Sequence, residues 1–167
     1  MRVMGIDCGS SYTGYGVVDQ AGVHDLNCCV AGAIRLKSGD AMASKLQKIF
    51  TDLTAIMTEH QPEIVAIEEV FYASNVKSAL KLGQVRGVAM LAAASLGLPV
   101  AEYSPLSIKS AVVGYGRADK NQVQQMVMRL LRLPEPPQPA DTADALAIAI
   151  CHIHTASTLK RYQTVTS

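Results

Sequence analysis

The chain has 167 residues, of which 49% are hydrophobic and 17% are charged, and its formal net charge is +1. This length suits one domain with a full core, and the composition excludes a disordered chain. Every apolar run is shorter than the roughly 20 residues that a membrane-spanning helix needs, so we expect no membrane segment. The four cysteines form no disulfide framework and the chain opens on a strand-like run instead of a signal peptide, which predicts a cytoplasmic protein.

The first part of the chain predicts three strands. Residues 2–8 form a nearly continuous apolar run, which is typical of a buried strand. Residues 15–18 and 26–36 follow as a second and a third strand, with a hairpin signal at 20–22 between them. We expect these three strands to form an antiparallel meander.

Helices and strands alternate in the rest of the chain. Apolar positions at helical spacing predict a long helix over 41–60, which Asp40 can cap and Pro62 ends. The elements that follow are a strand at 63–70, a helix at 76–97, a strand at 99–103, helices at 104–112 and 119–132, an extended connector at 134–139 and a helix at 141–154. This order predicts an α/β fold, a five-stranded mixed sheet flanked by helices with the first and fourth strands as central neighbours. The domain is expected to span 1–157, and the polar tail at 158–167 is expected to be frayed.

Four acidic residues stand beside apolar segments: Asp7, Glu68, Asp141 and Asp144. A carboxylate in that setting is costly unless it is paired, hydrogen-bonded or bound to a metal ion. Asp7 belongs to the first predicted strand and Glu68 to the fourth, so pairing of these strands brings the two acids together. The spacing of Asp141 and Asp144 puts both on one face of the last helix. Oxygen ligands without histidine or cysteine favour Mg²⁺ or Mn²⁺.

Structural explanations compete with this interpretation. Asp141, with an acid three residues later, resembles a helix capping box, and Asp7 could accept hydrogen bonds from the turn at 9–14. Glu68 is harder to explain, because alternation along a strand puts Glu68 and Glu69 on opposite faces. Only one of these two glutamates can then be a surface residue, and the other is directed to the site.

Charge is distributed unevenly along the chain. Residues 1–70 carry five basic and nine acidic side chains, a net charge of −4, whereas residues 71–133 carry eight basic and two acidic ones, a net charge of +6. The middle third is therefore a candidate polyanion-binding surface, although a solvated helix face explains the same pattern. Two metal ions can activate a water and stabilise the leaving oxygen of a phosphodiester, so the acids and the basic segment together indicate a metal-dependent nuclease.

These residues also carry a resemblance. The matching stretches are residues 5–10, 13–17, 66–71, 79–84 and 140–149, with Asn75, Arg86, Gly87, Lys109, Val112, Gly114 and Lys120. In order and spacing they resemble the RuvC family of Holliday junction resolvases along nearly the whole chain. The resemblance implies a ribonuclease H-like fold, a homodimer and a Mg²⁺-dependent crossover junction endonuclease, in which Mn²⁺ can substitute and two ions bind once DNA is present. It implies paired symmetric nicks in four-way DNA junctions during recombination and repair, 5′-phosphate and 3′-hydroxyl ends, and cooperation with a branch-migration motor.

The resemblance also implies roles for individual residues. The catalytic and metal-binding acids of the family correspond to Asp7, Glu68, Asp141 and Asp144. The family's catalytic lysines correspond to Lys109 and Lys120, which flank a glycine-rich loop and could clamp phosphates. The family's aromatic residue near the junction centre corresponds to Phe71, which could stack on an unpaired base or lie in the core. The predicted DNA contacts are Phe71, Tyr72, Lys77, Lys81, Arg86, Lys109, Arg117 and Lys120.

The helix predicted at 76–97 is the expected dimer contact. Ala79, Gly83 and Gly87 recur there at four-residue intervals, and small residues permit close approach of another backbone. Packing on the protein's own sheet is the alternative. Two positions depart from the family's pattern: Cys8 replaces the usual proline, and Glu69 replaces a frequent glutamine and adds negative charge close to the expected DNA path.

Three other functions fit parts of the sequence. The turn at 7–14 resembles the phosphate loop of actin-like ATPases and sugar kinases, but those proteins need two lobes and 167 residues are too few. A ribosomal-RNA-processing nuclease on the same fold would act on RNA instead of junction DNA. A junction-binding protein without chemistry would lack the acids, and all four are present.

Overall fold

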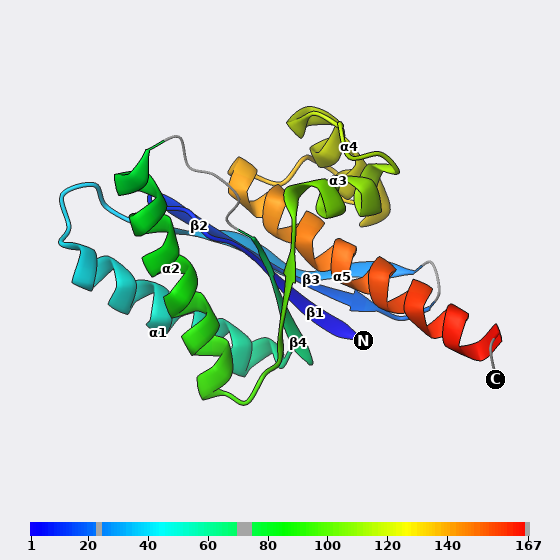
Figure 1. Ribbon diagram of the computed structural model, residues 1–167, viewed down its shortest axis with the longest axis horizontal. Coiled ribbons are helices and arrows are strands. Elements are labelled where there is room, and N and C mark those ends of the chain that lie inside the picture. Colours follow the sequence, from blue (N-terminus) through cyan, green and yellow to red (C-terminus); the bar gives the residue numbers. More distant parts are fainter. Residues whose placement is uncertain (23–24, 70–74, 166–167) are drawn as a thin grey trace.

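A computed structural model describes residues 1–22, 25–69 and 75–165 (Figure 1). In chain order the elements are β1 (Arg2–Asp7), β2 (Tyr12–Gln20), β3 (Leu26–Arg35), α1 (Met42–His60), β4 (Ile64–Glu68), α2 (Val76–Ser95), β5 (Val100–Tyr103), α3 (Pro105–Val113), α4 (Lys120–Leu130) and α5 (Ala140–Val165). The predicted order of strands and helices is confirmed. Within the described residues, no helix is long and apolar enough to cross a membrane.

The sheet has the strand order β3-β2-β1-β4-β5. The predicted meander is confirmed, because β1 pairs antiparallel with β2 and β2 pairs antiparallel with β3. The predicted central pair is also confirmed, since β1 lies parallel to β4 with Ile6 opposite Ile67. Asp7 and Glu68 are the last residues of these two neighbouring strands, so both acids stand at the same edge of the sheet.

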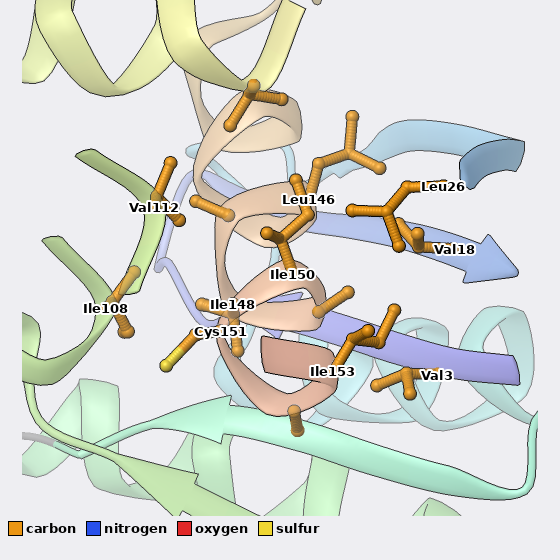
Figure 2. Packing of buried hydrophobic residues seen from close by; sticks show 14 of the residues in the cluster. Val3, Val18, Leu26, Ile108, Val112, Leu146, Ile148, Ile150, Cys151 and Ile153 are labelled. Atoms are coloured by element: carbon orange, nitrogen blue, oxygen red, sulfur yellow. The ribbon is translucent and has the colours of Figure 1, made fainter. Parts of the chain in front are cut away.

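Helices cover both faces of the sheet, with α1 and α2 on one face and α3, α4 and α5 on the other (Figure 1). Side-chain alternation along each strand divides the core accordingly. Ile6 and Ile67 belong to the cluster under α1 and α2. Leu146 and Ile150 of α5 pack toward the sheet beside Leu26 (Figure 2). The acid that follows each isoleucine therefore points to the α5 face.

Glycines allow α5 to lie directly on β1 and β2. A Cβ atom added to Gly5 would lie 2.0 Å from the carbonyl oxygen of Ala145, and one added to Gly14 would lie 2.0 Å from that of Asp141. No side chain fits at such distances, because packed protein interiors leave no room for an extra carbon atom. These contacts fix the first turns of α5 over the edge of the sheet where Asp7 ends β1.

Two predicted boundaries are wrong. β2 begins at Tyr12 and not at Tyr15, because Gly14 and Gly16 interrupt the apolar run while still pairing with the neighbouring strands. The last helix continues to Val165 instead of ending at His154, so residues 158–165 are helical where a frayed tail was expected. No glycine or proline follows residue 139 to stop this helix. Residues 166–167 lie outside the described part of the chain.

Candidate active site

Three elements bring the four acids together. Asp7 and Glu68 end adjacent parallel strands, and both point toward α5. The first turns of α5 place Asp141 and Asp144 above them, because Gly14 lets the helix backbone approach the sheet. The helix begins at Ala140, so Asp141 lies inside the first turn and does not precede the helix, which argues against the capping-box interpretation. A carboxylate in the first turn is also favoured by the helix dipole.

The electrostatics of the site show how close these acids are. Burial, followed by the charges of Asp144, Glu68 and Asp141, raises the pKa of Asp7 to about 7. Burial and then Asp144 also raise the pKa of Glu68, while Lys109 and Lys120 counteract this effect. Neighbouring carboxylates raise one another's pKa only at short range. The four acids therefore form one cluster, in which four carboxyl groups outnumber the two nearby lysines.

The cluster opens into a cavity of about 370 Å³. Its lining includes the acids Asp7, Glu68 and Asp144 and the two lysines Lys109 and Lys120. Asp141 is not part of the lining, but its charge is one of the causes that raise the pKa of Asp7. The cavity thus combines acidic groups with two cations that could hold a phosphate.

The two lysines are held at the cavity by the starts of α3 and α4. Ser104 caps α3, which carries Lys109, and Pro105 occupies its first turn. Asp119 caps α4 in a capping box, so that Lys120 is the first residue of that helix. The Lys120 Nζ atom lies 2.6 Å from Oδ2 of Asp144. This hydrogen bond to Asp144 is the largest contribution that raises the pKa of Lys120, so its ammonium group is a permanent counter-charge in the site.

The donor set fits a hard divalent cation. Among the described residues, no three histidine, cysteine, aspartate or glutamate side chains already stand where they would hold one metal ion together. The chemistry of the cluster nevertheless requires positive charge: the proton on Asp7 and the ammonium of Lys120 supply part of it. Carboxylate oxygens without a nitrogen or sulfur ligand are the donors that Mg²⁺ or Mn²⁺ takes.

The structure places three further predicted DNA contacts, Lys77, Lys81 and Arg117, on the surface. Lys77 and Lys81 are exposed on the first turns of α2, and Arg117 is exposed in the segment between α3 and α4. Phe71 and Tyr72 lie outside the described residues. Lys77, Lys81 and Arg117 do not line the 370 Å³ cavity, and their role in DNA binding stays a prediction.

Arg86 differs from those cations, because it is bonded inside the chain. Its Nε–H donates to the backbone carbonyl oxygen of Glu68 at 3.2 Å, and its guanidinium group forms an ion pair with Glu102 of β5. Sequence reasoning missed Glu102. The signal that could have found it is an acid within the otherwise apolar run at 99–103.

The two departures from the family's pattern lie next to the acids. Burial, with a smaller contribution from Asp7, raises the pKa of Cys8 to about 12. Its thiol is therefore protonated at neutral pH and is a poor nucleophile. Glu69 is half-buried, and its backbone N–H donates to the carbonyl oxygen of Tyr103 at 2.8 Å, which continues the pairing of β4 with β5.

A five-stranded mixed sheet, with acids ending its two central parallel strands and more acids on the covering helix, defines a ribonuclease H-like protein. The family follows from comparison with known proteins. The model of the family described as "Crossover junction endodeoxyribonuclease RuvC" matches residues 3–152, and the chain belongs to that family.

Individual relatives agree with this assignment. The chain is 65% identical over 161 residues to the crossover junction endodeoxyribonuclease RuvC of Koribacter versatilis, covering 96% of this chain and 97% of that protein. It is 56% identical to the protein of the same name from Acidobacterium capsulatum, covering 98% and 99%. Among solved structures, Thermus thermophilus RuvC in complex with a Holliday junction substrate matches with a TM-score of 0.90 and 34% identity, covering 95% of this chain and 96% of that one.

Proposed function

We propose that the chain is a Holliday junction resolvase, an endonuclease that makes paired symmetric nicks in four-way DNA junctions during recombination and repair. The observation that carries this proposal is the acidic cluster with two lysines in one cavity, on a chain that belongs to the RuvC family. The T. thermophilus relative, which shares this fold over nearly its whole length, was solved with a Holliday junction substrate. The DNA products of this chain would carry 5′-phosphate and 3′-hydroxyl ends, as the family resemblance implies.

Asp7, Glu68, Asp141 and Asp144 would hold Mg²⁺, or Mn²⁺ in its place, with two ions per site once DNA is bound. Bound metal supplies a water activated for attack on phosphorus and stabilisation of the leaving oxygen. The raised pKa values of Asp7 and Glu68 support this assignment, because both report negative charge that calls for a cation.

Lys109 and Lys120 would bind and orient the phosphodiester. They reach the cavity from two different helices, so they can contact the phosphate from two directions. Lys120 already forms a charge-assisted hydrogen bond with Asp144, and its ammonium group can exchange that carboxylate for a phosphate oxygen. Either lysine would then stabilise the charge that develops on the phosphate during cleavage. The exposed cations Lys77, Lys81 and Arg117 would contact DNA further from the cut.

A second copy of the chain would pack on the outer face of α2. Apolar and small residues form an exposed stripe at helical spacing along this face: Val76, Leu80, Gly83, Gly87 and Leu91. Leu80 is 65% exposed and Leu91 is 58% exposed. Among the described residues, no neighbouring heavy atom lies within 4 Å of a Cβ added to Gly83 or Gly87. Ala79 is half-buried beside this stripe. A symmetric dimer would present two equal sites to a two-fold junction.

Two further parts of the proposal concern a protein partner and the cellular compartment. Cooperation with a branch-migration motor rests on the family resemblance alone. A place in the cytoplasm is supported by four cysteines that are all free thiols, because reducing compartments keep thiols unpaired.

Incubation with a synthetic four-way junction tests the proposal. We expect paired symmetric nicks with Mg²⁺, none in EDTA, and none in a linear duplex of the same sequence. Asp7→Asn should abolish cleavage while junction binding persists, whereas Asp40→Asn, at an exposed position outside the cavity, should cleave normally. Full cleavage by Asp7→Asn would contradict the acidic site. Cleavage of structured RNA but not of the junction would favour a ribosomal-RNA-processing nuclease.

A further inference from the structure

Arg86 lies on the face of the sheet opposite the acids. Its helix neighbours Val85 and Ala89 are buried in the cluster under α1 and α2, together with Ile67 of β4. The Arg86 side chain is only 20% exposed. The Glu68 carboxylate points to the other face, toward α5. Arg86 therefore contacts the backbone of Glu68 from behind, while the carboxylate of Glu68 lines the cavity.

The guanidinium group bonds to residues of two neighbouring strands, β4 and β5. Pairing between β1 and β4 stops at Ile6 and Ile67, so the Glu68 carbonyl lies one residue beyond it. Arg86 donates to that carbonyl and, with its other branch, pairs with Glu102 of β5. A planar guanidinium group presents several donors at fixed angles and suits two acceptors at once. Glu68 is thus tied to α2 and β5 at the point where its strand ends.

We propose that Arg86 is a positioning residue of the acidic site: through the Glu68 carbonyl and Glu102 it fixes the direction of the Glu68 carboxylate, and it does not contact DNA. This inference rests on the proposed function. It replaces the DNA-binding role predicted for Arg86 from the sequence. Loss of a group that orients a metal ligand commonly lowers metal affinity or activity by about 10–100-fold. The effect of losing the Arg86 contacts should therefore be large enough to measure.

Arg86→Gln is the main variant, since it removes both the positive charge and the planar guanidinium group with its several donors. Arg86→Lys keeps the charge but cannot reproduce two donors at fixed angles. Arg129→Gln is the matched control, because it makes the same substitution at an exposed arginine near the end of α4, outside the cavity and outside the predicted DNA contacts. Three quantities are compared: Mn²⁺ affinity of the DNA-free protein by electron paramagnetic resonance, junction affinity in EDTA over a range of salt, and the single-turnover cleavage rate with Mg²⁺.

For Arg86→Gln we expect Mn²⁺ affinity and cleavage rate to fall about 10-fold each, with junction affinity and its salt dependence unchanged. Arg86→Lys should be impaired in the same two quantities, because the geometry matters and not only the charge. Arg129→Gln should bind Mn²⁺, bind the junction and cleave it at the wild-type level.

Two outcomes would overturn the inference. A weaker junction complex whose log–log salt slope is lower by about one would show that Arg86 contacts a phosphate. A lower melting temperature with wild-type Mn²⁺ affinity and wild-type cleavage by the folded fraction would show a merely structural role. If the wild-type protein does not nick junctions at all, the proposed function fails instead, and the Mn²⁺ titration still decides the role of Arg86.

Discussion

The glycines under α5 and the glycines on α2 have opposite surroundings. Gly5 and Gly14 have no room for another carbon atom, whereas Gly83 and Gly87 face open space within the described structure. The first pair lets a helix backbone reach the sheet and so positions the acids of α5. The second pair weakens its helix by about 1 kcal/mol per glycine relative to alanine and gains no contact within the described residues. The glycines of the sheet are thus explained by packing inside the chain, whereas the glycines on α2 have no such explanation within the described residues and fit the proposed dimer contact.

The largest effect should come from Gly14→Ala. Its new Cβ would lie 2.0 Å from the carbonyl oxygen of Asp141, so the first turn of α5 would have to move. We expect the free energy of unfolding to fall by about 3 kcal/mol and cleavage to fall by about 100-fold, measured by thermal denaturation and single-turnover assays. Gly39→Ala, where no neighbouring atom of the described chain lies within 4 Å of the added carbon, should change neither quantity. A fully active and stable Gly14→Ala variant would contradict the claim that α5 needs a glycine at position 14 to lie on the sheet.

Gly87→Glu tests the other side of the comparison. A carboxylate on the exposed stripe would meet its own copy in a symmetric contact, so we expect dimer dissociation to become at least about 10-fold easier because like charges repel. Sedimentation over a range of protein concentrations measures this. Gly87→Ala should stabilise the monomer by about 1 kcal/mol, because alanine is the better helix former. A dimer that tolerates Gly87→Glu would place the contact elsewhere.

Removal of one charge from the cluster should stabilise the metal-free protein. The pKa of Asp7 is about 7 in the folded chain and 3.8 as its ordinary value. The protonated form therefore contributes stability that is complete below about pH 4 and is lost as the pH rises to about 7. At pH 8 in EDTA, Asp7→Asn should raise the free energy of unfolding by about 2–4 kcal/mol. This gain should shrink as the pH falls and vanish near pH 4; a gain independent of pH would contradict this explanation.

The smallest effect concerns the pH dependence of metal binding. Because Asp7 must lose its proton to bind a cation, Mn²⁺ affinity should rise with pH and level off above about 7, the pKa of Asp7. Calorimetric titration in buffers of different ionisation enthalpy should show proton release below that pH. Gly39→Ala should give the same curve as the wild type. Affinity that does not change between pH 5.5 and 8 would mean that Asp7 is not a ligand.

Local sequence patterns were enough for most of the fold. The apolar run at 2–8 and the acid-bearing run at 63–70 predicted two central strands, and their pairing placed Asp7 beside Glu68 as observed. The prediction was wrong where a distant contact decides the structure. Gly14 interrupts a strand pattern, yet it lies within β2 because α5 needs that space. The polar residues after His154 predict an early end for the last helix, but no helix-breaking residue follows and α5 continues to Val165.

The residues of the site likewise include some that the sequence predicts and some that only tertiary packing brings together. Its acids could be found from the sequence, since charged residues in apolar runs are conspicuous. The two cavity lysines came from the family resemblance, because an isolated lysine carries no sign of where its helix will point. The tie between Arg86 and Glu102 was missed, because α2 and β5 meet only through tertiary packing. Phe71 and Tyr72 lie outside the described residues, and their predicted roles stay predictions.

At the start of α5, main-chain atoms contact the sheet: the carbonyl oxygens of Asp141 and Ala145 lie where side chains on Gly14 and Gly5 would be. Side chains at 141 and 144 can consequently be exchanged without moving the helix that presents them. The first turns of α5 are therefore a suitable place to redesign metal preference, for example with histidine in place of one aspartate to favour softer ions. Such a redesign would change the chemistry of the ligands while keeping their position.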